Sequence, residues 1–473
     1  MRKKFLSIFF CLIMLTSALF AGACGTDGGK IKVSIGMWPD PTLTQDVAMY
    51  KKWEEAFEAD YPQYDIVADS YTYSPDTITA KAISKQLPTV FQTYFTEPQK
   101  LIAQGFISDV TDSLKELGWY DKMDPAMREA VSKDGRVYGV PRDGYGMGLF
   151  LNLSMLYDVG EIDKDDDGNY ILHDENGNPL YPTTFDDLRR VSEAVTEAYD
   201  STYGMVVLSA DKNGGWQFSN MAWNFGCENL QVQNADGSWS ANLNDPGAVS
   251  ALEWIREMRM DELIYPDASL TYLDWYAKIG SNNVAMAFCG SDALSLPVTN
   301  YNFPLQDMAF VPMPTGDGTS RYSLYGGTPY VFASYATQEQ IKGALLFLKY
   351  IGRSPETDEI SLSAIEVGYQ TAQSKGMPIL PTIRPWINKD YVLAAGALEA
   401  KYVNVNMDYY QDFFDSIGTM KKSEEPNSCQ DMYALLDNAL QSVLSNPSGA
   451  NCLSLLTTAN NQFQNNYLSK IGK

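Results

Sequence analysis

Several aromatic residues of this sequence stand beside an acid or an amide in segments that read as turns. A flat ring can stack on the apolar face of a sugar, while a carboxylate or amide at the ring's edge binds the hydroxyl groups. Core packing is the alternative for each ring, because large aromatics also fill hydrophobic interiors. The candidate binding residues that share this pattern are Trp38 with Asp40, Tyr94 with Glu97, Tyr145 with Asp143, and Trp223 with Asn224.

Other residues are binding candidates on weaker grounds. Asp292 follows a predicted strand that ends at Cys289, so its loop is placed to reach a binding cleft. Trp53 and Trp254 lie on helical faces and are assigned to the core. Arg384 could pair with a charged ligand, although we expect it to form a structural salt bridge. The weaker aromatic candidates are Trp275, Tyr325 and Trp386.

Motifs that carry catalysis are absent from the sequence. Its single histidine, His173, leaves little for a histidine base or a histidine-rich zinc site. No nucleophile elbow, phosphate-binding loop or dinucleotide fingerprint occurs. A glycoside hydrolase needs two carboxylates about 5–9.5 Å apart, and no acid pair stands out in a motif among the 59 acids. We therefore expect no enzyme, with a secreted glycoside hydrolase as the alternative.

One acidic segment offers either a calcium site or a polar hairpin. Its acids have the spacing of a calcium loop, in which closely spaced oxygens surround a hard cation. Position 12 is Asp rather than the longer Glu, which weakens bidentate binding. Asn176-Gly177 is a hairpin turn signal. We expect the hairpin, with calcium as the alternative and no other cofactor. The residues at loop positions 1, 3, 5, 6 and 12 are Asp163, Asp165, Asp167, Gly168 and Asp174.

The first thirty residues follow a processing pattern. Three basic residues precede an apolar run from Phe5 to Phe20, which is shorter than the roughly 20 residues of a membrane span. The run ends in Ala21-Gly22-Ala23-Cys24, which resembles a bacterial lipobox. We therefore expect residues 1–23 to be a signal peptide and Cys24 to be lipidated, with residues 24–30 as the tether. Two acyl chains suffice for stable anchoring, so the protein should sit on the outer face of the cytoplasmic membrane.

The charge and the cysteines narrow the class of protein further. A formal net charge of −24 argues against nucleic acid as a partner, because binding to phosphates draws on clustered Lys and Arg. No second apolar run reaches spanning length, so the lipid anchor is the only membrane contact we expect.

Apart from Cys11 and Cys24, four cysteines remain. Cys429 and Cys452 could tie two C-terminal helices together, and four free thiols are the alternative. The four cysteines are Cys227, Cys289, Cys429 and Cys452.

The remainder of the chain alternates between predicted strands and helices. A strand at residues 32–35 precedes a helix whose apolar residues recur every three or four positions up to Phe57. Strands at 65–70 and 89–95 enclose a short helix. Thr184, Asp245 with Pro246, and Thr337 are helix start signals later in the chain. This alternation predicts an α/β fold with a mostly parallel sheet.

At residues 133–152 the sequence reads KDGRVYGVPRDGYGMGLFLN, and here it resembles family 1 extracellular solute-binding proteins of ABC sugar importers. Other pieces agree in order along the chain: Lys-Lys-Trp-Glu before Tyr61-Pro62, the segment 182–188, and Tyr325-Gly326-Gly327. Leu151 stands where the family commonly has Tyr, which is a departure from the family pattern.

The resemblance implies a two-lobed, periplasmic-binding-protein-like (type II) fold, with lobes joined by crossing hinge strands. From the family pattern, lobe 1 comprises 31–146 and 309–352, and lobe 2 comprises 147–308 and 353–473, with passages near Gly146, Ala309 and Gly352. The glycines around the first passage give a strand the freedom that a hinge needs, and close backbone approach is the alternative reading. They are Gly139, Gly144, Gly146 and Gly148.

The function implied by the resemblance is that of a monomeric, lipid-anchored extracellular protein. It would bind a carbohydrate, expected to be an oligosaccharide, between its lobes and deliver it to the transmembrane subunits of an ABC permease. A solute-sensing surface lipoprotein with the same fold is a further alternative. Which sugar binds depends on where loop side chains lie, so the sequence does not predict it.

Overall fold

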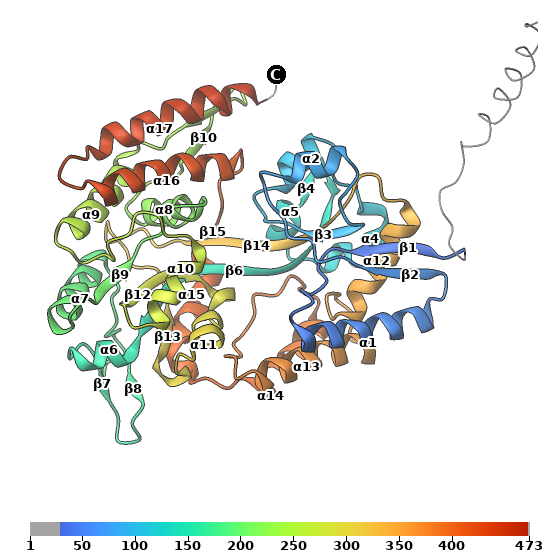
Figure 1. Cartoon of the computed structure of the whole chain (residues 1–473), viewed down its shortest axis with the longest axis horizontal. Helices are drawn as coiled ribbons and strands as arrows, with labels where there is room; N and C mark the ends of the chain where they lie inside the picture. Colours follow the sequence, from blue (N-terminus) through green and yellow to red (C-terminus); the bar gives the residue numbers. More distant parts are fainter. Residues whose placement is uncertain (1–28, 472–473) are drawn as a thin grey trace, which may run out of the picture.

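Two lobes joined by a pair of long strands make up the protein (Figure 1). The computed structural model describes residues 29–471. The predicted signal peptide, Cys24 and most of the tether lie outside the described residues. The α/β fold class is confirmed, and so is the division into two lobes, because separate hydrophobic cores form on either side of the crossing strands.

Lobe 1 is built from the N-terminal residues and from a later segment that follows the second crossing strand. Its elements are β1 (Ile31–Ile35), α1 (Thr44–Asp60), β2 (Tyr64–Ala68), α2 (Ile78–Ile83), β3 (Val90–Gln92), α3 (Pro98–Ala103), α4 (Thr111–Glu116), η1 (Tyr120–Lys122), α5 (Pro125–Ala130), β4 (Ser132–Lys133), β5 (Arg136–Val137), α12 (Gln338–Tyr350), α13 (Glu359–Ser374) and α14 (Lys389–Tyr402).

Lobe 2 holds the middle of the chain and its C-terminal helices. Its elements are α6 (Leu153–Asp158), β7 (Asp163–Lys164), β8 (Tyr170–Ile171), α7 (Phe185–Ala198), β9 (Tyr203–Val206), α8 (Asn213–Asn224), β10 (Gln231–Gln233), β11 (Trp239–Ala241), α9 (Pro246–Met260), α10 (Tyr272–Gly280), β12 (Val284–Gly290), η2 (Ser291–Ala293), α11 (Leu296–Tyr301), η3 (Leu305–Asp307), β13 (Met308–Val311), η4 (Met407–Tyr409), α15 (Gln411–Met420), β15 (Lys421–Ser423), α16 (Cys429–Ser445), α17 (Cys452–Asn466) and η5 (Leu468–Lys470).

The crossing strands are β6 (Gly139–Asn152) and β14 (Ser323–Phe332), and they pair antiparallel. The strand order is β2-β1-β3-β14-β6-β12-β9, with β13 also on β6 and β15 also on β14. The outer pairs, β1 with β2 and β9 with β12, are parallel. The crossing strands pair antiparallel with β3, β12 and β13, whereas β15 pairs parallel with β14. A register shift separates Thr328 from Pro329, where proline cannot donate a ladder hydrogen bond.

Helix start signals in the sequence place several of these elements. Thr184 and Asp187 form a capping box at the start of α7, and Asp245 caps α9 with Pro246 at its first turn. Thr337 and Gln340 form a capping box for α12. All three predicted starts are confirmed, because each depends on residues within one turn of the helix.

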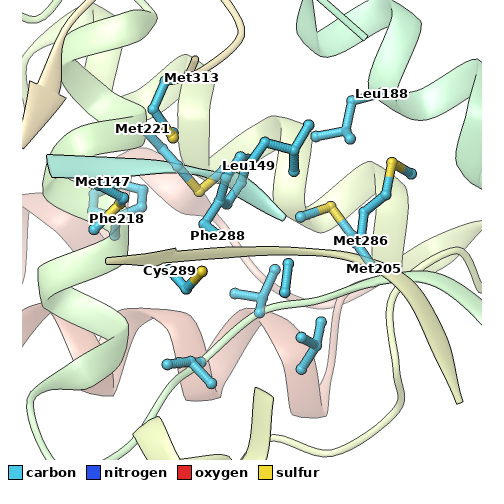
Figure 2. Packing of buried hydrophobic residues seen from close by; sticks show 14 of the residues in the cluster. Met147, Leu149, Leu188, Met205, Phe218, Met221, Met286, Phe288, Cys289 and Met313 are labelled. Atoms are coloured by element: carbon cyan, nitrogen blue, oxygen red, sulfur yellow. The ribbon is translucent and has the colours of Figure 1, made fainter. Parts of the chain in front are cut away.

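The core of lobe 2 encloses the second half of β6. Met147, Leu149, Phe150 and Leu151 are all inaccessible to solvent. Figure 2 shows Leu149 beside Phe288 of β12 and Met147 beside Phe218 of α8, with methionines filling the spaces between neighbouring elements. Both faces of this strand are therefore buried, which fixes the end of the crossing strand firmly within lobe 2.

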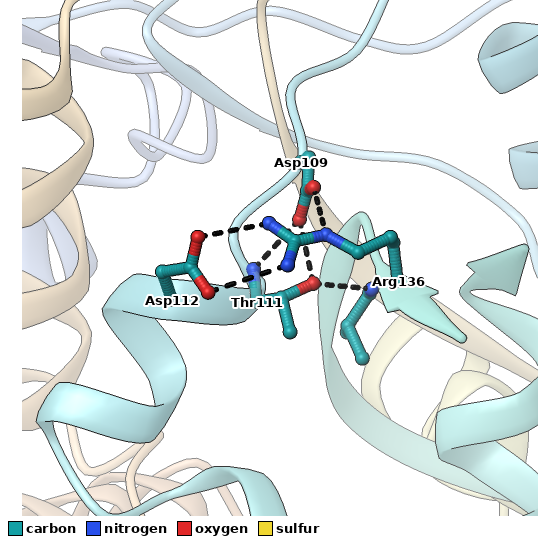
Figure 3. A network of polar contacts seen from close by, with 5 residues as sticks. Asp109, Thr111, Asp112 and Arg136 are labelled. Atoms are coloured by element: carbon teal, nitrogen blue, oxygen red, sulfur yellow. Dashed lines mark hydrogen bonds and ion pairs between the residues drawn. The ribbon is translucent and has the colours of Figure 1, made fainter. Parts of the chain in front are cut away.

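In lobe 1, an ion-pair network holds the segment that leads into β6. Arg136 of β5 pairs with Asp109 and, at 2.9 Å, with Asp112 at the start of α4 (Figure 3). Thr111 Oγ1 donates to Asp109 Oδ1 at 2.6 Å and accepts from the Val137 backbone N–H at 2.7 Å. The first crossing strand thus begins from an anchored position.

The chain changes lobe at positions that differ from two of those expected. Ala309 lies in β13, pairs with Leu151 and is buried in the core of lobe 2, so the second passage is β14 itself. Gly352 is followed by α13 and α14, which stay on lobe 1, where Lys375, directly after α13, pairs with Asp46 of α1 at 2.8 Å. The third passage lies between α14 and η4. The sequence pattern identifies a strand or a helix but not the elements that pack beside it. This accounts for both differences in where the chain changes lobe.

The glycines of β6 allow close packing in this conformation. A Cβ on Gly144 would lie 2.6 Å from the Tyr325 hydroxyl, and one on Gly148 would lie 2.6 Å from the Phe310 ring. Gly139 and Gly146 have similarly close neighbours. The alternative reading of these residues, close approach of neighbouring groups, therefore accounts for their presence.

Candidate functional site

A cleft of about 500 Å³ lies between the lobes, against the crossing strands. Lobe 1 supplies residues 73–76 and Tyr94, and lobe 2 supplies residues 211–213, Trp216 and residues 271–273 together with Asp292. Tyr145, Gly327 and Thr328 of the crossing strands also line it, as do three residues after β15. These three are Glu424, Gln430 and Tyr433.

Aromatic rings cover the lobe 2 wall of this cleft. The ring centroids of Tyr145 and Trp216 lie 6.1 Å apart, and those of Trp216 and Tyr272 lie 5.7 Å apart, with edge-to-face geometry. On the lobe 1 side, the Tyr73 and Tyr94 centroids are 5.4 Å apart. Tyr94 is 44% exposed, so its ring is available to a ligand. The two lobes therefore present flat apolar surfaces to the same space.

Two glycines in neighbouring strands leave room for the Tyr145 side chain. A Cβ on Gly326 of β14 would collide with the Tyr145 hydroxyl, and a Cβ on Gly290 would lie 3.2 Å from Tyr145 Cδ2. The same Gly290 Cβ would lie 2.6 Å from Asp292 Oδ1. The Tyr145 ring and the Asp292 carboxylate are therefore neighbours at the floor of the cleft.

The turn before α8 positions Trp216. Asp211 and Lys212 both adopt positive φ angles, 59° and 70°. Asp437 of α16 accepts from the backbone N–H groups of Lys212, at 2.6 Å, and Gly215, at 2.7 Å. These contacts fix the start of α8, and the aromatic wall with it.

Acidic groups dominate the polar lining of the cleft. The Asp292 carboxylate is exposed to the cleft yet enclosed by protein, and this loss of solvation, with Asp143 nearby, raises its pKa to about 6 despite Arg142. Burial raises the pKa of Glu424 to about 7, although the Tyr433 hydroxyl donates to it at 2.9 Å. Neither carboxylate has a basic side chain bonded to it among residues 29–471.

Two contacts join the lobes across this cleft. Lys212 Nζ of lobe 2 lies 2.9 Å from Asp76 Oδ1 of lobe 1. Gln430 Nε2 of lobe 2 donates to Thr96 Oγ1 of lobe 1 at 3.1 Å. The two lobes are thus in direct polar contact at the cleft.

Further space adjoins this cleft. Glu424 also lines a cavity of about 410 Å³ between the lobes, together with Phe95, Gln99, Glu129 and Tyr325. The carboxylate of Glu424 therefore borders both spaces.

A second cavity, of about 510 Å³, also borders Asp143 and Asp292. Three arginines line it, of which Arg142 pairs with Asp143 at 2.7 Å and Arg384 pairs with the buried Glu399 at 2.7 Å. The structural salt bridge expected for Arg384 is therefore present. Asp143 consequently belongs to this second cavity and does not line the aromatic cleft.

The structure brings together only some of the residues that the sequence nominated. Tyr94, Tyr145 and Asp292 line the aromatic cleft, and Tyr325 lines the adjoining space. These residues lie at or beyond the ends of strands or on a crossing strand, where the sequence pattern placed them. The remaining candidates do not line any of these three spaces; they are Trp38, Asp40, Glu97, Trp223, Asn224, Trp275 and Trp386.

Packing explains why these candidates do not reach a cleft. Trp223, Trp275 and Trp386 are at most 1% exposed and lie in the cores. Trp38 packs edge-to-face on Tyr50 at 5.3 Å. The other three are polar and have partners within their own lobe: Asp40 accepts from Thr42 Oγ1 at 2.6 Å, Glu97 accepts from the Tyr73 hydroxyl, and Asn224 bonds the Tyr322 backbone.

Sequence reasoning missed most of the aromatic wall. Trp216 follows a polar turn after strand β9, and this strand-end position was the signal that could have identified it. Tyr272 begins a helix after a similar loop. No local signal marks Glu424 or Tyr433, because they reach the cleft only through the packing of the C-terminal segment.

The acidic segment forms a hairpin with two tight turns. Asp165 accepts from Asn169 and Asp174 accepts from Asn178, through both the backbone and side-chain N–H groups of each asparagine. Asp163 starts β7, which pairs with β8. No group of three or more metal-binding side chains converges within residues 29–471.

The four remaining cysteines are free and buried. A disulfide between Cys429 and Cys452 is therefore contradicted. These residues begin two different helices, and their thiols are unpaired. Within the described chain, no helix combines the length and apolar character that crossing a bilayer requires.

Comparison with known proteins gives one family match. The family model for bacterial extracellular solute-binding proteins matches residues 52–368. No curated protein sequence matches significantly.

Solved structures share the fold over nearly the whole chain. The GacH receptor of Streptomyces glaucescens, solved unliganded and with acarbose, has 15% identity and a TM-score of 0.67, covering 93% of this chain and 98% of that one. Maltose-bound MalE3 of T. maritima has 17% identity and a TM-score of 0.64, covering 92% and 99%. A chitin oligosaccharide binding protein has 18% identity and a TM-score of 0.63, covering 93% and 99%.

Proposed function

We propose that this chain, which belongs to the bacterial extracellular solute-binding proteins, binds a carbohydrate between its lobes and delivers it to an ABC-type permease. The observation that carries the proposal is the aromatic wall of Tyr145, Trp216 and Tyr272, which faces Tyr94 across a cleft with a polar floor. Rings of this kind stack on the C–H faces of a sugar, while carboxylates accept hydrogen bonds from its hydroxyls.

An oligosaccharide is the proposed ligand form. The aromatic cleft alone is within the range of about 300–1,000 Å³ that small-molecule sites occupy. The space that adjoins it at Glu424 gives room for a further ring. Similar solved proteins are described with acarbose, maltose or chitin oligosaccharide as ligand, which favours this class.

Binding without covalent change is the proposed activity. Ligand held between two lobes is enclosed by their closure about the crossing strands, and this closed form is what a permease would recognise. The Lys212–Asp76 contact illustrates how the lobes can meet across the cleft. Release to the permease then requires only reopening, without any bond being broken in the sugar.

Export and lipidation complete the proposal. The apolar run Phe5–Phe20 and the sequence Ala21-Gly22-Ala23-Cys24 support cleavage before Cys24 and attachment of lipid to it. The protein would then be a monomer anchored at the outer face of the cytoplasmic membrane. Mass spectrometry of the membrane-extracted protein tests this: a diacylglyceryl Cys24 supports it, and an unmodified N-terminus contradicts it.

Calorimetry of the protein without its first 24 residues, against a panel of neutral oligosaccharides, tests the binding function. Micromolar or tighter binding is expected, with the ligand recovered intact by chromatography after prolonged incubation. Shorter products would instead identify a hydrolase, and the absence of binding to any member of the panel would contradict a sugar-binding role. Tyr94→Ala is the cleft variant, and Tyr157→Ala, of similar exposure, is its control.

A further inference from the structure

We propose that the carbohydrate bound in the aromatic cleft carries a protonated amine, so that the preferred ligand is an amino sugar. This inference rests on the proposed function, and it deepens that function by assigning a charge to the ligand. The ammonium group would lie against the Tyr145 ring, and the carboxylates of Asp292 and Glu424 would balance its charge.

The charges that line the cleft are strongly unbalanced. Four carboxylates face it, and among the described residues that line it Lys212 is the only basic one. That lysine is already paired with one of the four, Asp76. Three carboxylates are left without a cationic partner within the described lining; they are Asp211, Asp292 and Glu424.

Arginine from the neighbouring cavity offsets this imbalance only in part, because Arg142 lowers the pKa of Asp292 but leaves it raised overall. Arg142 is paired with Asp143, its neighbour in sequence, at 2.7 Å, and neither residue lines the aromatic cleft. The raised pKa values of Asp292 and Glu424, due first to burial, agree with carboxylates that lack a nearby cation strong enough to hold them charged. A cationic ligand would supply that charge.

The geometry places aromatic faces where the amine would sit. Asp292 Oδ1 and the Tyr145 ring both border Gly290, and Asp292 and Glu424 both act electrostatically on the Tyr145 hydroxyl. Trp216 and Tyr272 continue the same wall. An ammonium held over such rings gains a cation–π attraction in addition to its attraction to the carboxylates.

Two of the side-chain donors in this lining are already engaged. Gln430 Nε2 already donates to Thr96, and the Tyr433 hydroxyl already donates to Glu424. The Asn213 side-chain oxygen accepts from the backbone N–H of Tyr272. A ligand that carries a negative charge, such as a uronate or a sugar phosphate, would face like charges in this lining.

Calorimetry at pH 7 with three disaccharides of one linkage tests the inference. The probes are the β-1,4 glucosamine disaccharide, its di-N-acetyl form, and cellobiose. We expect the free amine to bind about tenfold more tightly than either neutral sugar, as a partly desolvated cation over an aromatic ring would. The advantage should shrink in 0.5 M salt, because added ions screen the charges.

Charge-neutral variants separate a charge effect from a change of shape. Asp292→Asn and Glu424→Gln should each lower the affinity for the amine several times more than the affinity for cellobiose, so that most of the advantage of the amine is lost. Asp186→Asn, on the exposed first turn of α7, should leave both unchanged. Equal loss for all three sugars in the cleft variants would overturn the inference, because it would indicate a damaged cleft.

The remaining outcomes are distinguishable. If cellobiose binds as tightly as the amine, the proposed preference for an amine is wrong. The sugar-binding proposal is then unaffected. Failure of every sugar to bind would overturn both. Putrescine, an amine without a sugar ring, should bind weakly, and binding as tight as that of the amino disaccharide would overturn the assignment of the ligand as a sugar.

Discussion

Lys212 Nζ of lobe 2 lies 2.9 Å from Asp76 Oδ1 of lobe 1, so one ion pair joins the two lobes at the aromatic cleft. The carboxylate of Asp76 is 77% exposed, and pairs with such an exposed partner contribute about 0–1 kcal/mol. The contact is therefore suited to bias the lobes toward closure without locking them.

Removing this contact should open the protein slightly and weaken ligand binding. Asp76→Asn is expected to lower the affinity up to about fivefold, in line with the energy of an exposed pair, and to increase the radius of gyration measured by small-angle scattering. Glu116→Gln, which breaks the Lys342–Glu116 pair within lobe 1, is the matched control. If the two variants behave alike, the contact has no role in closure.

Tyr94 should contribute to affinity and little to stability. Its ring is 44% exposed on the lobe 1 side of the cleft, so Tyr94→Ala should weaken sugar binding about tenfold while changing the free energy of unfolding by less than about 0.5 kcal/mol. Tyr157→Ala, at a residue 42% exposed in lobe 2, should change neither. Calorimetry and urea denaturation measure the two effects. Unchanged affinity in Tyr94→Ala would exclude the ring from the site.

Asn224 should be important for folding and not for ligand contact. Its amide donates to the backbone oxygens of Asn220 and Tyr322, and its oxygen accepts from the Tyr322 N–H at 2.8 Å, all within a buried setting. Asn224→Ala should lower the free energy of unfolding by about 3 kcal/mol, because buried backbone groups lose partners. Asn300→Ala, at an exposed position, should cost little. A loss of affinity without a loss of stability would contradict this.

The raised pKa of Asp292 gives stability a defined pH dependence. Its pKa rises from 3.8 to about 6 on folding, so between these values the folded state holds more protons than the unfolded state. Stability contributed by this group is therefore present at low pH and is lost as pH rises through about 6. Asp292→Asn should gain stability relative to wild type between pH 4 and pH 7 in thermal unfolding scans. A constant difference would contradict the shift.

Calcium should leave the protein unchanged. Asp165 and Asp174 lie in separate turns, and each already accepts from the amides of an asparagine. A site with a dissociation constant one hundredth of the calcium added would stabilise the fold by about 2.7 kcal/mol. We expect no rise in melting temperature with calcium, and the same result for Asp165→Ala. A rise that this variant abolishes would establish a calcium site.

Local sequence patterns predicted those parts of the fold that depend on residues close together in the sequence. The capping boxes at Thr184 and Thr337 are formed by residues three positions apart, so the sequence alone determines where these helices begin. Tyr145 and Asp292 could be nominated because one lies on a glycine-rich strand and the other follows a buried strand. The two-lobed fold itself followed from the order of several motifs along the chain.

Only the tertiary structure decided which side chains line the cleft. Trp216 and Trp223 lie seven positions apart on α8, yet the first lines the cleft and the second is in the core, because the helix packs beneath β14 and α16. Ala309 reads as a strand in sequence, but its pairing with Leu151 places it in lobe 2. Glu424 meets Tyr145 from 279 positions further along the chain. Such proximity depends on long-range packing, which no local spacing encodes.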